Sequence, residues 1–174
     1  MIDFTASPDE PAGSPAGPVT LLSGLGAYLE TTLELIAGAR LQLRVLSQEL
    51  DRRVWNDPDV VESLRVFALR SQHAELRILL NRPQRAAQRG HRLVELARQL
   101  PSRIAIRELN EARRGLVEEF AVADEQALIY RRHHDDLDAQ WCAHAPLDAR
   151  RLRRRFDLLW DESPPARELA ILGL

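Results

Sequence analysis

The densest group of potential metal ligands and nucleophiles lies between residues 131 and 144. This segment contains His133, His134 and His144, with Cys142 and several aspartates beside them. Such nitrogen, oxygen and sulfur donors suit a transition metal ion. No standard ligand spacing is met, however, and polar clusters between neighbouring strands are usually solvated hairpin loops. We therefore expect neither a metal site nor a cofactor in this segment.

A second group with chemical potential is a run of arginines near the C-terminus. Five arginines lie within residues 150–155, a density that could bind a nucleic-acid backbone or another acidic surface. Neighbouring aspartates can pair with them at helical spacing, which favours a solvated helix face instead. Both interpretations stay open for the candidate partner-binding residues Arg150, Arg151 and Arg154.

A smaller candidate anion site lies at residues 91 and 92. His91 and Arg92 follow Gly90 at the expected start of a helix, where backbone N–H groups favour negative charge. A lone histidine in such a place is more often exposed or a helix cap. The pair is therefore a candidate binding site for an anion or a partner, and helix capping is the alternative interpretation.

The absence of lysine excludes several mechanisms. All 24 basic residues are arginine. A P-loop lysine, a Schiff-base lysine for pyridoxal phosphate and a lysine general base are therefore impossible in this chain.

Length and composition are typical of one globular domain. The chain has 174 residues, 45% of them hydrophobic, and a net charge of −2, so no global basic field attracts nucleic acid. Residues 1–18, rich in Pro, Gly and Ser, predict a disordered tail, and residues 19–174 a single domain. One cysteine and no long apolar run predict a cytoplasmic protein without a membrane span.

The hydrophobic periodicity predicts an α/β domain in which helices flank a mixed β-sheet. Helical spacing of apolar residues predicts helices over 20–38, 57–73, about 91–100 and 147–161. Alternating or short apolar runs predict strands at 40–47, 76–80, 104–106, 120–123, 128–130 and 139–142. Helices and strands alternate first and strands cluster later, which is the order expected for a mixed sheet.

This order of elements resembles one half of a phospholipase D-type protein. The resemblance spans roughly residues 28–161 and includes the phrases Ile36–Leu43, Ala74–Asn81 and Phe156–Trp160. It implies the fold of that superfamily and a reaction in which a histidine attacks phosphorus and a lysine stabilises the phosphoryl oxygens.

The diagnostic motif of that superfamily, His-x-Lys-x4-Asp, is degenerate in this chain. When the motif is aligned on the apolar run 120–123, Asp124 keeps the aspartate, but the lysine position is Glu119 and the histidine position is Val117. A valine offers no nucleophile, and a glutamate repels phosphate. The small Gly-Ser pair that follows becomes Arg131 and Arg132, and the asparagine becomes His134.

The resemblance therefore implies a degenerate, single-copy bacterial member of the superfamily without catalytic activity. Active members bring two motifs together, so a single copy implies a homodimer, and we expect a binding or regulatory module with a possible protein partner. Two alternatives stay open. One is a divergent phosphodiesterase that uses a histidine from 133–144, and the other is a nucleic-acid-binding accessory domain that uses the arginine-rich last helix.

Overall fold

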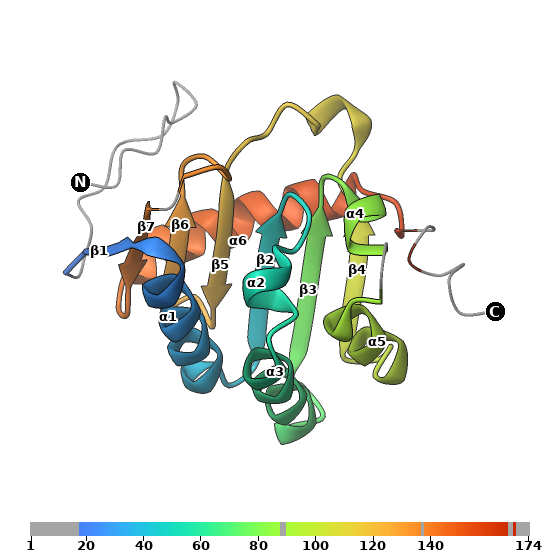
Figure 1. The fold of residues 1–174 in the computed structure, drawn as a ribbon, viewed down its shortest axis with the longest axis horizontal. Helices are drawn as coiled ribbons and strands as arrows, with labels where there is room; N and C mark the ends of the chain where they lie inside the picture. The colour runs from blue at the N-terminus through green and yellow to red at the C-terminus, as the bar shows by residue number, and fades with distance from the viewer. Residues whose placement is uncertain (1–17, 88–89, 137, 167–168, 170–174) are drawn as a thin grey trace.

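A mixed β-sheet forms the centre of the protein. The computed structural model describes residues 18–87, 90–136, 138–166 and 169, and within them seven strands lie in the order β1-β7-β6-β5-β2-β3-β4 (Figure 1). Strands β2, β3 and β4 are parallel, whereas β2 and β5, and then β5, β6, β7 and β1, pair antiparallel. The strands are β1 (Thr20–Ser23), β2 (Gln42–Ser47), β3 (Glu75–Leu80), β4 (Ile104–Glu108), β5 (Glu119–Ala123), β6 (Ala127–Arg131) and β7 (Asp138–Cys142).

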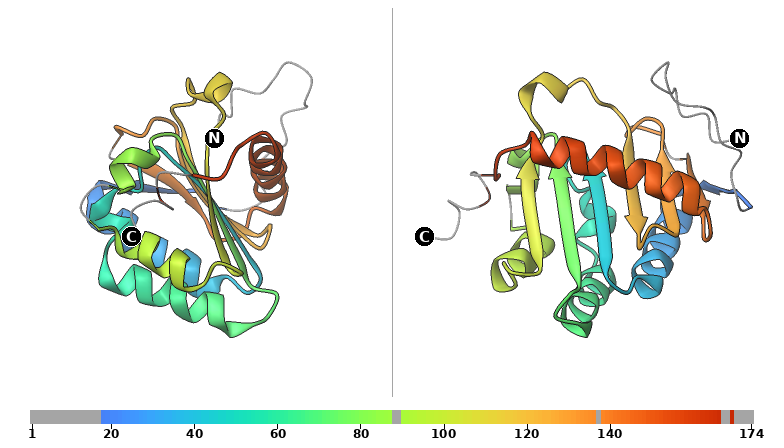
Figure 2. Two further views of the ribbon diagram at one scale, coloured as in Figure 1. Left: turned by 90° about the vertical axis from the view of Figure 1, so that its right-hand side faces the viewer. Right: turned by 180° about the vertical axis from the view of Figure 1, so that it is seen from behind.

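Helices cover both faces of this sheet. Helix α6 (Pro146–Asp161) crosses one face, and α1, α3 and α5 pack on the other (Figure 2). This arrangement confirms the predicted α/β class with a mixed sheet. The remaining helices are α1 (Gly24–Gly38), α2 (Arg52–Trp55), α3 (Pro58–Arg70), α4 (Pro83–Ala87) and α5 (Arg92–Gln99), with a 3-10 turn, η1 (Glu111–Arg113), after β4.

Each face of the sheet has its own hydrophobic core. Alternate residues of β2 point to opposite faces, so Val45 joins the core under α1, α3 and α5, whereas Leu46 joins the core under α6. Phe156 of α6 is fully buried against the second core and stacks on Trp160, with ring centroids 5.7 Å apart. Leu152, Phe156, Leu159 and Trp160 therefore face inward, as their helical period predicts, whereas Leu147 and Leu158 are exposed.

Local sequence features explain where several of the helices and strands begin and end. Asp57 caps α3 by accepting hydrogen bonds from the backbone N–H groups of Asp59 and Val60, and Pro58 occupies the first turn. The predicted strands at 40–47 and 76–80 correspond to β2 and β3. Short helices α2 and α4 were not predicted, because four or five residues carry no readable period.

The prediction of a helix from residue 20 is wrong at its start. Residues Thr20–Ser23 form the edge strand β1, which pairs antiparallel with β7, and the helix begins only at Gly24. Gly24 adopts a φ of 83°, a left-handed conformation that lets the chain turn from strand into helix. The apolar residues Leu21 and Leu22 suited either element, and pairing with β7 decides the outcome.

The predicted tail, residues 1–18, lies almost entirely outside the described residues. Among the residues that are described, no helix has both the length and the apolar character needed to cross a bilayer.

Candidate functional site

A small polar pocket opens at the carboxyl end of β2, the edge of the sheet where α/β proteins commonly bind ligands. It has a volume of about 150 Å³ and is formed by the start of α1, the loop after β2, the start of β5 and the segment after β6. Its lining residues are Leu25, Gln48, Glu49, Asp51, Arg53, Glu119, Arg131, His134, Asp135 and Asp136.

A buried ion pair closes the floor of this pocket. Glu119 and Arg131 face each other across β5 and β6, and the Nη1 atom of Arg131 lies 3.3 Å from Oε2 of Glu119. The side chains of both residues are only 8% exposed. The other carboxylate oxygen of Glu119 accepts hydrogen bonds from the Ser47 hydroxyl and the Gln48 backbone N–H, both at 2.7 Å. Both charges therefore have several partners inside the protein.

Arg131 is also held by an aromatic ring. Its guanidinium carbon lies 4.1 Å from the centroid of the Tyr28 ring, close enough for a cation–π contact, and its Nη1 donates to the carbonyl of His134 at 3.3 Å. Tyr28 itself is buried, and burial raises the pKa of its hydroxyl above the ordinary value, so the ring stays neutral.

The loop after β2 holds a strained conformation beside the pocket. Leu50 is buried and has a φ of 57°, which is uncommon for a residue with a branched side chain. Its N–H donates to the Ser47 hydroxyl at 3.2 Å, and that hydroxyl in turn donates to Glu119. Glu119 therefore stabilises the pocket floor and the strained loop together.

The loop also starts a short helix at the pocket rim. Asp51 caps α2 by accepting a hydrogen bond from the Arg53 N–H, and its carboxylate lies 2.7 Å from the Arg53 guanidinium. Burial raises the pKa of Asp51, but the hydrogen bonds from Arg53 outweigh it and hold the pKa below its ordinary value. This carboxyl group is therefore ionised at neutral pH.

Three of the positions that the alignment assigns to the motif meet at this pocket. Glu119, Arg131 and His134 all line it. Val117, at the position of the motif histidine, lies close to His134, because its carbonyl accepts the His134 backbone N–H at 2.9 Å. The Val117 side chain is 44% exposed. The aligned positions Val117, Glu119, Arg131 and His134 therefore lie close together in the fold.

Asp124 lies at the other end of the sheet. It occupies the turn between β5 and β6, where Asp124 and Glu125 have φ values of 49° and 55° and the Gln126 N–H donates to the Ala123 carbonyl. These values describe a type I′ hairpin turn, in which aspartate is favoured. The alignment assigns Asp124 to the same motif as Glu119, but the structure places Asp124 in this turn, at the other end of β5. The residue has the geometry and the function of a turn residue.

The Asp124 carboxylate ties this turn to the start of β2. It accepts hydrogen bonds from the backbone N–H groups of Arg40, Leu41 and Gln42, the last two at 2.8 and 2.7 Å. A larger cavity of about 630 Å³ opens beside it, lined also by Leu35 and Trp141. Its lining includes the carboxylates Glu34, Asp124 and Glu125 and the guanidinium of Arg40, but no histidine, cysteine or serine, and its size alone assigns no chemistry to it.

The two arginines of the motif alignment have different surroundings. Arg131 lines the pocket, whereas Arg132 is exposed and is not among the lining residues. Strand pleating predicts this difference, since consecutive residues point to opposite faces. The pocket therefore contains one of these two guanidinium groups.

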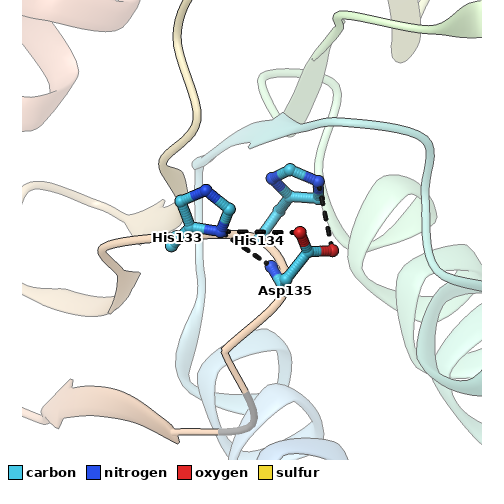
Figure 3. Close-up of side chains that lie close together, drawn as sticks. All are labelled: His133, His134 and Asp135. Carbon is cyan, nitrogen blue, oxygen red and sulfur yellow. Dashed lines mark hydrogen bonds and ion pairs between the residues drawn. The ribbon is translucent and has the colours of Figure 1, made fainter.

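Two histidines and an aspartate form a compact cluster at the pocket mouth. The rings of His133 and His134 stack with centroids 4.8 Å apart, and the Asp135 carboxylate lies within reach of both rings (Figure 3). Asp135 Oδ1 is 3.3 Å from Nε2 of His134, and its Oδ2 is 3.7 Å from Nδ1 of His133. One donor atom from each residue lies within 4.8 Å of the other two. Cys142 and His144 are not in this cluster, because β7 runs antiparallel to β6 and Cys142 pairs with Leu128 at the other end of that strand.

His91 serves as a helix cap and a loop support. It is 1% exposed; its Nδ1 accepts the Leu93 N–H at 3.3 Å, and its Nε2 lies 3.1 Å from the Leu50 carbonyl. In the neutral ring with the proton on Nε2, both nitrogens bond to backbone, and burial lowers the pKa of His91. Arg92 binds Asn56 through its N–H and its guanidinium. An external anion would therefore have to displace internal partners, which argues against the predicted anion site.

Most α6 arginines contact carboxylates of the same chain. Arg153 lies 2.7 Å from Glu125, and Arg155 lies 2.7 Å from Glu118. The predicted partner-binding residues make longer contacts: Arg150 lies 3.7 Å from Glu125, Arg151 lies 4.0 Å from Asp148, and Arg154 is exposed. The arginine run is therefore partly neutralised by the protein itself.

The sequence did not single out the residues that surround the motif positions. Ser47 ends β2 and Gln48 follows it, and both contact Glu119, which lies 72 and 71 positions later. Tyr28 belongs to α1 and contacts Arg131, more than a hundred positions later. A signal did exist, because polar residues at the carboxyl end of a buried strand are a common mark of a site. The contact of Tyr28 with Arg131 has no local signal in the sequence.

Comparison with solved structures defines the class of fold. The chain is similar to NucT from Helicobacter pylori, with a TM-score of 0.63 and 8% identity over 85% of this chain and 98% of that one. It is also similar to Nuc from Salmonella typhimurium, a phospholipase D family member, with a TM-score of 0.59 and 12% identity over 85% of this chain and 98% of that one. A third similar structure is TrmBL2, an archaeal chromatin protein, with a TM-score of 0.59 and 12% identity over 87% of this chain. The match covers 55% of TrmBL2, so this chain spans about half of that protein. The protein therefore has a phospholipase D-like fold.

The sequence itself assigns the chain to a particular family. Residues 25–172 match the family model described as Domain of unknown function (DUF7931). The chain belongs to this family. A search of the curated proteins gives no match.

Proposed function

We propose that this protein is a phospholipase D-like binding or regulatory module without phosphodiesterase activity. The observation that carries the proposal is the ion pair between Glu119 and Arg131, which occupies the place where the superfamily reaction needs a lysine. A carboxylate there has three hydrogen-bonding or charged partners within the protein. It therefore contributes to the fold where the motif lysine would stabilise phosphate.

The charge of the pocket supports this proposal. The lining contains five carboxylate-bearing residues but only two arginines, and one of those arginines is paired with Glu119. A phosphodiester substrate carries negative charge and would meet net repulsion from this lining. The nucleophile is missing as well, because Val117 has no group that can attack phosphorus.

A second part of the proposal is a homodimer. The chain matches nearly the full length of Nuc and NucT, so it corresponds to one copy of the fold. In the phospholipase D superfamily two such copies generally meet at their motif edges. Static light scattering at micromolar concentration tests this part. We expect twice the 19.8 kDa mass of one chain, and a mass of one chain would contradict it.

Binding of nucleic acid through α6 is the weaker alternative. TrmBL2 binds DNA, according to the description of its structure, and its fold is similar. In this chain, however, Arg153 and Arg155 already lie 2.7 Å from carboxylates. Strong salt dependence of DNA binding, reduced by substitution of the exposed Arg154, would favour this alternative over a protein partner.

An assay with a bis-aryl phosphate tests the missing activity. We expect no turnover above the buffer rate by the wild-type protein, at neutral pH and with or without added Zn²⁺. The matched variants His133→Ala, His134→Ala and His144→Ala separate the two ways in which the proposal can fail. Turnover that survives all three substitutions would show that the motif alignment is wrong. Turnover lost in one variant would reveal a divergent phosphodiesterase that uses that histidine.

A further inference from the structure

We propose that His133, His134 and Asp135 bind a divalent transition metal ion such as Zn²⁺ at the mouth of the polar pocket. Imidazole nitrogen and carboxylate oxygen are ligands that zinc accepts, and three protein ligands leave a position for water. The site goes beyond the proposed function and does not depend on it, because a bound ion can be structural or regulatory whether or not the protein catalyses a reaction.

The geometry of the cluster needs only a small contraction. Its three donor atoms lie within 4.8 Å of one another, whereas ligands about 2.1 Å from a tetrahedral ion are roughly 3.4 Å apart. Asp135 has 76% of its side chain exposed and the His133 side chain is 43% exposed, so both can change rotamer at little cost. Asp135 already lies 3.3 Å from the His134 ring. The required movement is therefore about 1 Å at exposed side chains.

The hydrogen bonding of His134 differs from that of a histidine with a purely structural role. His91 bonds to backbone through both ring nitrogens. In His134, Nδ1 is buried and has no hydrogen-bond partner among the described residues, and Nε2 lies beside the carboxylate of the exposed Asp135. The fold thus holds this ring in place without using either nitrogen for internal support. A ring placed in this way is free to offer Nε2 to an ion.

The electrostatic surroundings also favour a cation. The pocket beside the cluster contains Glu49, Asp51 and Asp136 in addition to Asp135 and Glu119, against the guanidinium groups of Arg53 and Arg131. This excess of carboxylates raises the local concentration of a divalent cation and opposes an anion. The same lining that argues against a phosphodiester therefore supports a metal ion.

Isothermal titration of the full chain with Zn²⁺ at pH 7.5 tests the site. We expect saturable binding of one ion per chain. His134→Ala and Asp135→Ala should each weaken it about tenfold or more, since even changes around metal ligands cost about 10- to 100-fold. His144→Ala is the control, because His144 is an exposed histidine outside the cluster, beyond the end of β7 that pairs with Leu128, and it should leave the affinity unchanged. Co²⁺ should give visible absorption that disappears in His134→Ala.

Several results would overturn this site. They are absence of saturable binding, unchanged affinity in the double variant His133→Ala/His134→Ala, and an equal loss in His144→Ala, which would indicate adventitious binding to surface histidines. Thermal unfolding of each variant without metal shows whether it is folded. Metal binding without turnover supports the site and leaves the proposed function intact. Turnover that appears only with Zn²⁺ would support the site but contradict the lack of catalysis.

Discussion

Breaking the ion pair between Glu119 and Arg131 should destabilise the protein by several kcal/mol. Opposite unit charges at the observed separation of 3.3 Å attract by about 5 kcal/mol at an effective dielectric constant of about 20. Removing one partner of a buried pair typically costs about 3–5 kcal/mol, because the other charge stays buried without compensation. We therefore expect Glu119→Gln to lose about 3 kcal/mol, less than Glu119→Ala, since glutamine can still accept from the Gln48 N–H.

Urea unfolding of a double-mutant cycle measures this effect. At a urea dependence of about 2 kcal/mol per M, a loss of about 3 kcal/mol moves the midpoint by about 1.5 M. The cycle Glu119→Gln, Arg131→Met and the double variant should give a coupling energy of about 2 kcal/mol or more. The pair Arg113–Glu162 is the matched control, with a similar 3.2 Å separation but half-exposed side chains, and should couple by less than about 1 kcal/mol. Additivity of the Glu119 and Arg131 substitutions within about 0.5 kcal/mol would refute the reasoning.

Two further predictions concern His91 and Asp124. Burial lowers the pKa of His91, so below the unfolded value near 6.5 the unfolded chain binds more protons. The unfolding free energy should therefore fall as the pH drops from 7 toward 5, and His91→Asn, which keeps a cap, should show a smaller fall in urea titrations. Asp124→Ala should cost about 2–4 kcal/mol through lost charge-assisted hydrogen bonds and a strained φ, whereas Asp124→Asn should cost less in the same assay. Equal costs for the two Asp124 substitutions would contradict the role of the turn.

The sequence predicts the sheet and its main helices because each long element carries a clear period. The apolar spacing of α6 and the capping residue Asp57 are local signals, and the structure agrees with both. The edge strand at Thr20–Ser23 was predicted as helix because four residues have no decisive period, and the pairing with β7 comes from residues more than a hundred positions away.

The candidate site was only partly predictable. The alignment places Glu119, Arg131 and His134 together, since a fixed strand–turn–strand spacing sets their relative positions. The alignment does not place Asp124 correctly relative to this pocket, because the turn between β5 and β6 lies at the opposite end of β5 from Glu119. Ligand spacing does not predict the three-residue donor cluster, because a loop can bring the side chains of consecutive residues together without any standard spacing.

The buried charge at Arg44 shows a further limit of sequence patterns. Its place in β2 alternates with Leu43 and Val45, a pattern that predicts a polar face for Arg44. Helix α6 covers that face, and Arg44 is only 3% exposed. Its guanidinium lies 2.8 Å from the carboxylate of Glu75 and 3.5 Å from that of Asp157. A strand pattern reports which face is more apolar, but a helix distant in the sequence decides which face is covered.

The most direct test of the closed pocket is a thermal-shift titration with inorganic phosphate and nucleotides. A ligand at 100 times its Kd adds about 2.7 kcal/mol to the stability of the folded state, which gives a readily measured rise in Tm. Because the Arg131 guanidinium is already paired with Glu119, we expect no specific stabilisation at millimolar phosphate or nucleotide. Arg132→Ala is the control, since Arg132 is exposed outside the pocket. A clear rise in Tm at micromolar nucleotide, abolished by Arg131→Ala and retained in Arg132→Ala, would contradict the account.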